Sequence, residues 1–302
     1  MSTIERIPAR PKEIGGGLMI RRALPNSTRP TVGAWCFLDH AGPVEIAAGA
    51  GLHVGPHPHI GLQTFTWMIE GEVMHRDSLG NEQLITPGQV NLMTAGGGIS
   101  HSEDSATGSR GAAPAAGRLH AVQLWIALPE EERHRAPAFR NHPDLPLLEL
   151  GGFTSRVLAG SALGRTSPVE VYSPLMAVDL EAAAAAAASL PVTSSYEHAA
   201  LTLSGEVQVA GQTLLPGTLL YLGVGREQLE LSCRSAARMI LIGGVPFGED
   251  ILLWWNFVAR RAEEMEQATR DWNTGTRFGV VKGSPSPPLI APSVAGLHLR
   301  AT

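Results

Sequence analysis

Cysteine is scarce in this chain, with two residues in 302. Cys36 follows Trp35, and Cys233 ends a short apolar segment, so neither has the spacing of a metal-binding cysteine pair. Both are predicted to be small buried side chains. The count allows a disulfide between them, but so few cysteines in a chain of this length favour a reducing compartment.

An excess of positive charge is also missing. The 23 Lys and Arg residues are outnumbered by 28 Asp and Glu residues, which gives a formal net charge of −5 and a pI near 6.1. A chain of this charge has no general attraction to phosphate backbones, so direct nucleic-acid binding is not expected. An indirect link through a protein partner is compatible with the charge.

Long apolar runs are absent as well. No run reaches the roughly 18 uncharged apolar residues of a membrane span. The nearest candidate, residues 174–190, is interrupted by Asp179 and Glu181. The first residues lack the apolar stretch of a secretory signal. We therefore expect a cytoplasmic protein that does not associate with membranes.

Aromatic residues make up only 5% of the chain, whereas glycine (34) and proline (22) are plentiful. This composition is typical of a turn-rich β protein, and the length predicts two domains. Short apolar runs between turns predict strands at residues 64–69, 73–75, 84–86, 90–94, 99–101 and 119–126. Such a series indicates a β-sandwich or barrel. Residues 104–118 are predicted to form a flexible surface loop.

The second half of the chain repeats segments of the first. Residues 203–207 (LSGEV) resemble residues 69–73 (IEGEV), and residues 214–217 (LLPG) resemble residues 85–88 (ITPG). The order is kept, so we predict two copies of one β unit, although matches this brief also arise by chance. We place the domains at residues 1–130, with a metal site, and 131–302, without metal ligands but with a helix and tail at its end.

Two short pairs of side chains predict the metal site. His57-Pro58-His59 and His101-Ser102-Glu103 each place two candidate ligands at positions i and i+2, which face the same side of a β-strand. Two such strands can bring three imidazoles and one carboxylate to one point. This donor set, which lacks thiolate, suits Fe(II), Ni(II), Mn(II), Co(II), Cu(II) or Zn(II). The sequence does not choose among these ions. Zinc with four protein ligands would tend to close a structural site, whereas iron, which favours six positions, would leave two for dioxygen and substrate and suits a cavity inside a barrel better.

Other candidate residues are weighed against simpler interpretations. His53 and His75 could support the site, but a solvated or hydrogen-bonded histidine is the better interpretation of each. The glycines at 96–98 lack the lysine and the strand-to-helix context of a phosphate loop. Shifting the four ligand positions by the repeat offsets reaches Pro191, Thr193, Glu230 and Ser232, which do not form an equivalent site.

Two segments of the second half have sequences that favour a helix. Residues 182–188 are seven alanines, which favour a helix by propensity, but their place before a repeated strand favours extended or irregular structure. Residues 262–272 predict a surface helix with Met265, Ala268 and Trp272 on one face.

The segment from His57 to Glu103 closely resembles the signature of the pirin family, which belongs to the cupin superfamily. Residues 32–43 (VGAWCFLDHAGP), 119–129 (LHAVQLWIALP) and 254–260 (WWNFVAR) are also pirin-like. The resemblance implies an all-β bicupin fold, with two cupin barrels packed face to face. It also implies one metal, usually iron, whose ligands in pirins match His57, His59, His101 and Glu103.

The resemblance implies two functions. One is a quercetin 2,3-dioxygenase, which opens a flavonol ring with dioxygen and releases carbon monoxide, with Glu103 as the general base. The other is a redox-responsive regulator that acts through a protein partner. We favour the dioxygenase; a metal-stabilised scaffold is the simplest alternative. Ile60 and Gln63 stand where pirins usually have Arg and Glu, so we expect a changed pocket charge and substrate preference.

Overall fold

The computed structural model describes residues 4–47, 50–105, 117–294 and 296. Within these ranges the chain forms 25 strands, one short 3₁₀ turn (η1, Gly15–Gly17) and one α-helix, so the predicted all-β class with a short helix near the end is confirmed. Most of the predicted surface loop, residues 106–116, lies outside the described residues. None of the described helices is long and apolar enough to cross a membrane.

Contacts between described residues divide the chain into two compact units. We call residues 12–20, 41–141 and 248–302 the histidine unit, and residues 1–11, 21–40 and 142–247 the apolar unit. The end of the chain thus groups with the candidate metal ligands. This grouping follows contacts in space, and the boundary between residues 130 and 131 stays a prediction about the sequence.

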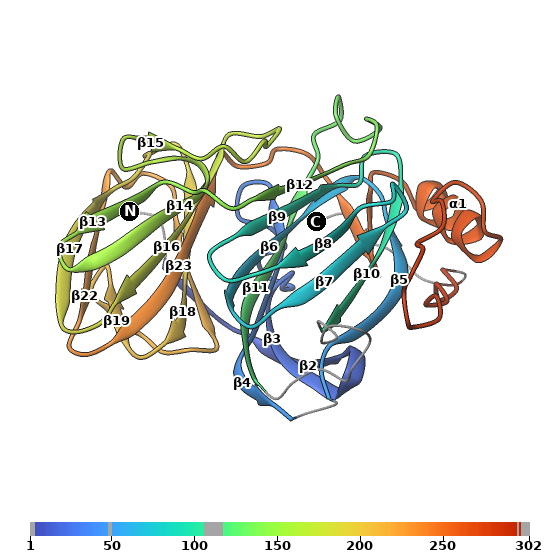
Figure 1. Cartoon of the computed structure of the whole chain (residues 1–302). Coiled ribbons are helices and arrows are strands. Elements are labelled where there is room, and N and C mark those ends of the chain that lie inside the picture. Colours follow the sequence, from blue (N-terminus) through green and yellow to red (C-terminus); the bar gives the residue numbers. More distant parts are fainter. Residues whose placement is uncertain (1–3, 48–49, 106–116, 295, 297–302) are drawn as a thin grey trace. The chain divides into compact units, whose positions relative to one another are not determined.

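The histidine unit is built on two sheets (Figure 1). The larger has seven strands in the order β12 (Ala138–His142), β9 (Val90–Thr94), β6 (Leu62–Glu70), β11 (Gly117–Ala127), β4 (Trp35–Ile46), β3 (Leu18–Leu24) and β2 (Arg10–Ile14). Four of these strands, β2, β3, β4 and β12, include some residues that lie outside the sequence ranges of the histidine unit. The smaller has four strands in the order β5 (His53–His59), β10 (Ile99–Ser105), β7 (Val73–Asp77) and β8 (Glu82–Ile85). Met68, Val73 and Ile85 belong to one buried apolar cluster of this unit.

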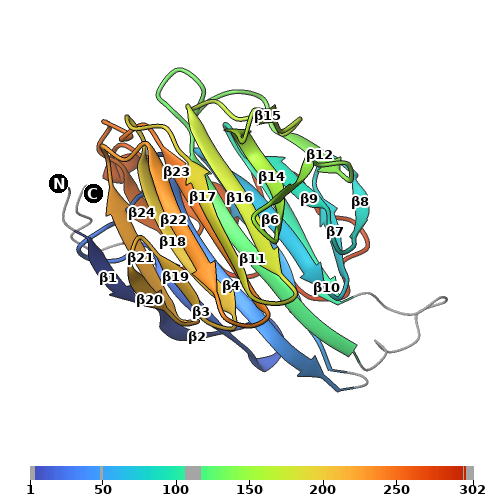
Figure 2. The ribbon, with the colours of Figure 1, turned by 90° about the vertical axis from the view of Figure 1, so that its left-hand side faces the viewer.

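The apolar unit repeats this plan (Figure 2). Its larger sheet runs β1 (Glu5–Pro8), β21 (Thr218–Gly223), β18 (Glu197–Ser204), β23 (Ala237–Gly244), β16 (Leu175–Ala182), β14 (Phe153–Ala162) and β13 (Leu147–Leu150), with β15 (Arg165–Thr166) paired to β14. Its four-stranded sheet runs β17 (Ala186–Pro191), β22 (Gln228–Cys233), β19 (Val207–Val209) and β20 (Gln212–Leu214). Side chains of both sheets contribute to one apolar cluster.

The predicted repeat is confirmed by the order of strands. The sheet β17-β22-β19-β20 matches β5-β10-β7-β8 strand for strand. Residues 69–73 and 203–207 lead into β7 and β19, and residues 85–88 and 214–217 lead out of β8 and β20. Gly71 and Gly205, at the same point of the two copies, have φ of +87° and +71°. Only glycine adopts such angles readily, which explains why this residue recurs in both copies.

As predicted, the alanine run is extended or irregular rather than helical. Strand β16 ends at Ala182, two bends follow, and β17 begins at Ala186. Ala182 and Ala186 are both buried in the apolar cluster, so tertiary packing overrides helix propensity here. Cys36 and Cys233 are both buried and free, which confirms their interpretation as small core residues.

The last elements pack beside β5 in the histidine unit. They are the strands β24 (Leu252–Trp254) and β25 (Phe257–Ala259) and the helix α1 (Ala262–Asn273), which begins one residue after Arg261. As predicted, Met265 and Ala268 are buried on one face of the helix, and Trp272 is partly buried against the same cluster. Phe257 forms a β-bridge with Ile60, directly after β5. This contact ties the end of the chain to the strand that carries two candidate ligands.

Candidate metal centre

Both predicted pairs lie on neighbouring strands of the four-stranded sheet. His57 and His59 are on β5, and His101 and Glu103 are on β10. His101 is the direct cross-strand partner of His57. Strand β5 is the edge of the sheet, which is where a proline such as Pro58 is tolerated.

A β-bulge lies beside the candidate ligands. His57 pairs with His101 but Val54 pairs with Glu103, so Gly55 and Pro56 together stand opposite Ser102. Bulges bend a strand and redirect its side chains. A Cβ on Gly55 would lie 2.1 Å from the carbonyl oxygen of Pro287, so only glycine fits at this bulge.

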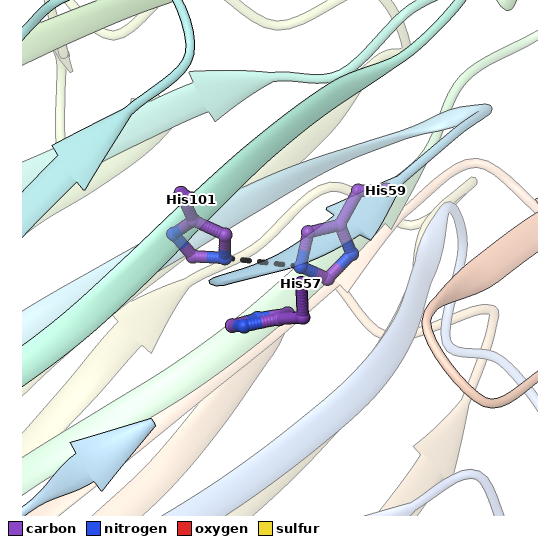
Figure 3. Close-up of side chains that lie close together, drawn as sticks. All are labelled: His57, His59 and His101. Carbon is purple, nitrogen blue, oxygen red and sulfur yellow. Dashed lines mark hydrogen bonds between the residues drawn. The ribbon is translucent and has the colours of Figure 1, made fainter. Parts of the chain in front are cut away.

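Three imidazoles converge on one point (Figure 3). Their candidate ligand atoms all lie within 4.8 Å of one another. The side chains of His57, His59 and His101 are 7%, 1% and 2% exposed. The Nε2 atoms of His59 and His101 are 3.0 Å apart, so these rings point their nitrogens at each other inside the protein.

Hydrogen bonds decide which ring nitrogens carry protons. The Nδ1 atom of His57 is 2.9 Å from the carbonyl oxygen of Gly55, and that of His59 is 3.0 Å from the carbonyl oxygen of Asn256. A carbonyl only accepts, so each Nδ1 carries the proton in the neutral ring and each Nε2 is left as a bare lone pair. Backbone carbonyls therefore set two of the three rings as ligands.

A divalent metal fits this arrangement. A cation that binds the Nε2 atoms of both His59 and His101 would bring two nitrogen lone pairs to a separation such as the 3.0 Å observed. Burial lowers the pKa of His57 to about 4 and, together with the neighbouring histidines, holds the pKa values of His59 and His101 well below the usual value. The neutral form of each imidazole, which is the form that binds a metal, is therefore favoured at neutral pH. Two nitrogens bound at about 2.1 Å and at a right angle would stand about 3.0 Å apart, as observed.

Glu103 is not one of the three converging residues, so its role as the fourth ligand stays a prediction. Burial, and then the charge of Asp104, raises the pKa of Glu103 to about 7. Asp104 in turn faces His53, whose Nδ1 lies 3.5 Å from an Asp104 oxygen. The ring of His53 is 39% exposed, in keeping with the simpler interpretation of this histidine.

His75 and Asp77 form a third pair with the same spacing, on β7. Strand β7 lies beside β10, and Asp77 and His75 are the cross-strand partners of His101 and Glu103. The Nδ1 atoms of His75 and His101 are 3.4 Å apart, and His75 Nε2 is 3.3 Å from an Asp77 oxygen. Burial acts to raise the pKa of Asp77, but hydrogen bonds from His75 and Asn81 bring it below its usual value. From the sequence, His75 was predicted to be a solvated or hydrogen-bonded histidine, and Asp77 was assigned no role in the site; the i, i+2 spacing of the two residues was the available signal.

The C-terminal strands supply a contact that the sequence did not reveal. Asn256, in the turn between β24 and β25, offers its backbone carbonyl to His59. In the same turn, Trp255 has φ of +52°, which is an uncommon backbone conformation for a residue other than glycine. Trp125 packs edge-on against the ring of His59, with centroids 5.2 Å apart. Any residue carries a carbonyl, so no side-chain pattern marks this role.

The two neutral replacements are both buried. Ile60, 5% exposed, follows His59 directly and bridges to Phe257. Gln63 is fully buried and donates a hydrogen bond of 2.9 Å to the hydroxyl of Thr94.

Two family models match the chain. The model of pirin matches residues 17–126, and that of the pirin C-terminal cupin domain matches residues 177–279. A Pseudomonas aeruginosa protein named "Putative quercetin 2,3-dioxygenase PA1205" is 50% identical over 292 residues, which cover 96% of this chain and 90% of that protein. A "Pirin-like protein" of Caulobacter vibrioides is 39% identical over 272 residues, 88% of this chain and 92% of that protein.

A solved structure agrees over nearly the whole chain. The crystal structure of quercetin 2,3-dioxygenase from Acinetobacter baumannii is 47% identical and covers 99% of this chain and 97% of that chain, with a TM-score of 0.93.

Proposed function

We propose that this chain, which belongs to the pirin family, is a mononuclear metal protein with quercetin 2,3-dioxygenase activity. Its ligands would be His57, His59, His101 and Glu103, and its ion would be Fe(II), with Ni, Mn, Co, Cu or Zn as ions that the same donors accept. The convergence of three buried imidazoles, two of which have Nε2 left bare by carbonyl contacts at Nδ1, carries the proposal. Relatives at 50% and 47% identity that bear the name of this enzyme support the choice of reaction.

The proposed reaction consumes one dioxygen and releases one carbon monoxide for each flavonol ring that is opened. The metal would supply Lewis acidity toward the flavonol's 3-hydroxyl and bring dioxygen close to the substrate. Glu103 would accept the proton of that hydroxyl on a carboxylate oxygen. The three histidines would hold their rings in fixed orientation through their Nδ1 contacts, and the buried setting would limit water around the reacting groups.

The test is turnover by protein loaded with one metal at a time. Quercetin and oxygen consumption and carbon monoxide release should coincide in a 1:1:1 ratio with Fe(II). We expect His101→Ala and Glu103→Gln each to reduce the rate by at least about 100-fold, because one removes a ligand and the other the base. Glu230→Gln is a matched control, since Glu230 is an exposed residue of β22 in the apolar unit, and it should leave the rate unchanged.

Absence of turnover with fully loaded Fe, Ni, Mn and Cu protein would contradict the enzymatic proposal. A protein partner whose affinity differs between the Fe(II) and Fe(III) forms would then identify the redox-responsive regulator instead.

A further inference from the structure

We propose that His75 and Asp77 are positioning residues: Asp77 holds His75, and the hydrogen bond between His75 and His101 keeps the Nε2 atom of His101 bare and directed at the metal. This inference rests on the proposed metal site and extends it by one shell of residues. His75 and Asp77 lie on β7, next to the strand that carries His101.

The three side chains form a continuous buried chain. Nδ1 of His101 is 3.4 Å from Nδ1 of His75, and Nε2 of His75 is 3.3 Å from Oδ2 of Asp77. His101, His75 and Asp77 are 2%, 3% and 2% exposed. Water therefore does not compete for these contacts, and each ring nitrogen has to find its partner within the protein.

The Asp77 carboxylate fixes the direction of both hydrogen bonds that connect His101, His75 and Asp77. The Asp77 carboxylate can only accept, so Nε2 of His75 donates to it. In the neutral ring this leaves Nδ1 of His75 as an acceptor, which takes the proton of His101 Nδ1. Nε2 of His101 is then the bare nitrogen, and it is the atom that lies 3.0 Å from Nε2 of His59.

Asp77 and His75 are themselves held in place. One oxygen of Asp77 accepts from the backbone N–H groups of Leu79 (2.9 Å) and Asn81 (3.0 Å), and the other accepts from the side-chain amide of Asn81 (2.8 Å). The ring of His75 stacks on Phe139, with centroids 4.3 Å apart and planes 13° apart. A turn and an aromatic stack thus orient the chain before any metal binds.

His101 differs from the other two histidines in this respect. His57 and His59 donate to neutral backbone carbonyls, whereas His101 is connected to a carboxylate through His75. The bond from His75 to the charged Asp77 is stronger than one to a neutral acceptor, and it makes Nδ1 of His75 a better acceptor for the proton of His101. Such contacts behind a ligating histidine make it a better metal ligand. Loss of the hydrogen bonds that connect His101, His75 and Asp77 should therefore lower the affinity for the metal and alter the electronic structure of the bound ion.

The test uses Co(II) as the probe, because its affinity can be measured by competition with a chelator and its visible spectrum reports on the ligands. His75→Phe keeps an aromatic ring beside Phe139 but removes both nitrogens. We expect it to weaken Co(II) binding by about 10- to 100-fold and to shift the spectrum. Asp77→Asn should have the same effect to a smaller degree. His75→Gln, whose amide can accept from His101 and donate to Asp77, should recover part of the affinity.

A second readout concerns the metal-free protein. Nitrogen-15 NMR of the histidine rings should find the His101 proton on Nδ1 in the wild type and divided between Nδ1 and Nε2 in His75→Phe. His198→Gln is the matched control for His75→Gln, because His198 is a fully buried histidine of the apolar unit. It should change neither readout.

The outcomes separate this inference from the proposed function. Failure of the wild type to bind Co(II) would overturn the metal site itself, and with it the role of His75. Wild-type binding with unchanged affinity, spectrum and His101 proton position in folded His75→Phe and Asp77→Asn would overturn the positioning role alone. If His75→Phe does not fold, Asp77→Asn and His75→Gln decide the matter by the same measurements.

Discussion

The two four-stranded sheets have the same strand order, but one buries polar side chains where the other buries apolar ones. In the histidine unit the buried positions of β5, β10 and β7 include His57, His59, His101, His75 and Asp77. In the apolar unit the buried positions of β17, β22 and β19 belong to the apolar cluster: Leu190, Val207, Val209, Leu229, Leu231 and Cys233. The cross-strand pairs correct the equivalence obtained from the sequence offsets: the pair His57–His101 corresponds to Leu190–Leu229, and Glu103 corresponds to Leu231. Three of the four candidate ligands therefore occupy positions that the other copy uses for its core.

The difference has an energetic consequence. Burying a leucine side chain contributes about 1.5–3 kcal/mol, whereas taking the polar nitrogens of several imidazoles out of water costs free energy. A bound cation would offset this cost in the histidine unit. The apolar unit, with its complete hydrophobic cluster, has no such requirement.

The largest expected effects come from one substitution in each unit: the one in the histidine unit should lower metal affinity, and the one in the apolar unit should lower stability. His101→Ala should weaken Co(II) binding by more than about 100-fold, because removing a ligand costs more than removing an outer-shell contact, with a smaller change in stability. Leu231→Ala should cost about 2–5 kcal/mol of unfolding free energy and leave Co(II) affinity unchanged. Metal titration and denaturant unfolding of both variants check this pair. Loss of metal binding in Leu231→Ala, at a temperature where this variant is folded, would show that metal binding depends on the core of the apolar unit and would contradict the prediction.

Metal removal should have the next largest effect. An ion that binds only the folded chain adds about 2.7 kcal/mol to the unfolding free energy when its free concentration is 100 times the dissociation constant. Thermal unfolding with and without a chelator measures this gain. His101→Ala should show no gain, since it lacks a complete site, while His198→Gln should show the full one.

Acid should destabilise the metal-free protein through its buried neutral histidines. Burial lowers the pKa of His198 in the apolar unit to about 4, so between pH 6.5 and 4 the unfolded chain binds a proton that the folded chain does not. Stability must therefore fall as the pH falls, by up to about 1.4 kcal/mol per pH unit for such a residue. His198→Gln should flatten the pH dependence of the unfolding free energy by that amount. An unchanged slope would show that His198 is not buried in its neutral form.

The smallest effect is expected at His53. Its ring is 39% exposed and faces Asp104 rather than the three converging histidines. His53→Gln should change Co(II) affinity by no more than about threefold, well below the 10- to 100-fold effect of an outer-shell contact. A loss comparable with that of His75→Phe would place His53 in the site.

Local patterns predicted much of the architecture. The turn glycines Gly71 and Gly205 marked the repeat because backbone with positive φ requires this residue. The i, i+2 pairs predicted that His57, His59 and His101 share a sheet face, because the side-chain period of a strand is two. Residues 182–188 show the limit of propensity, since burial in the apolar cluster decided their conformation.

What the sequence could not predict depends on contacts between distant segments. The carbonyl of Asn256, which orients His59, is 197 positions away in the chain and has no side-chain signature. The role of His75 depends on which strand lies beside β10, and spacing alone does not fix that neighbour. The grouping of residues 12–20 and 248–302 with the histidine unit likewise follows from packing.

The central claim is that one ion binds where His57, His59 and His101 converge. The most direct measurement is an anomalous-scattering map of Co(II)-loaded crystals. A single strong peak within about 2.1 Å of the three Nε2 atoms, with a Glu103 oxygen as a further neighbour, is the predicted result. A map without a peak at the three histidines, from protein loaded at saturating Co(II), would contradict the claim.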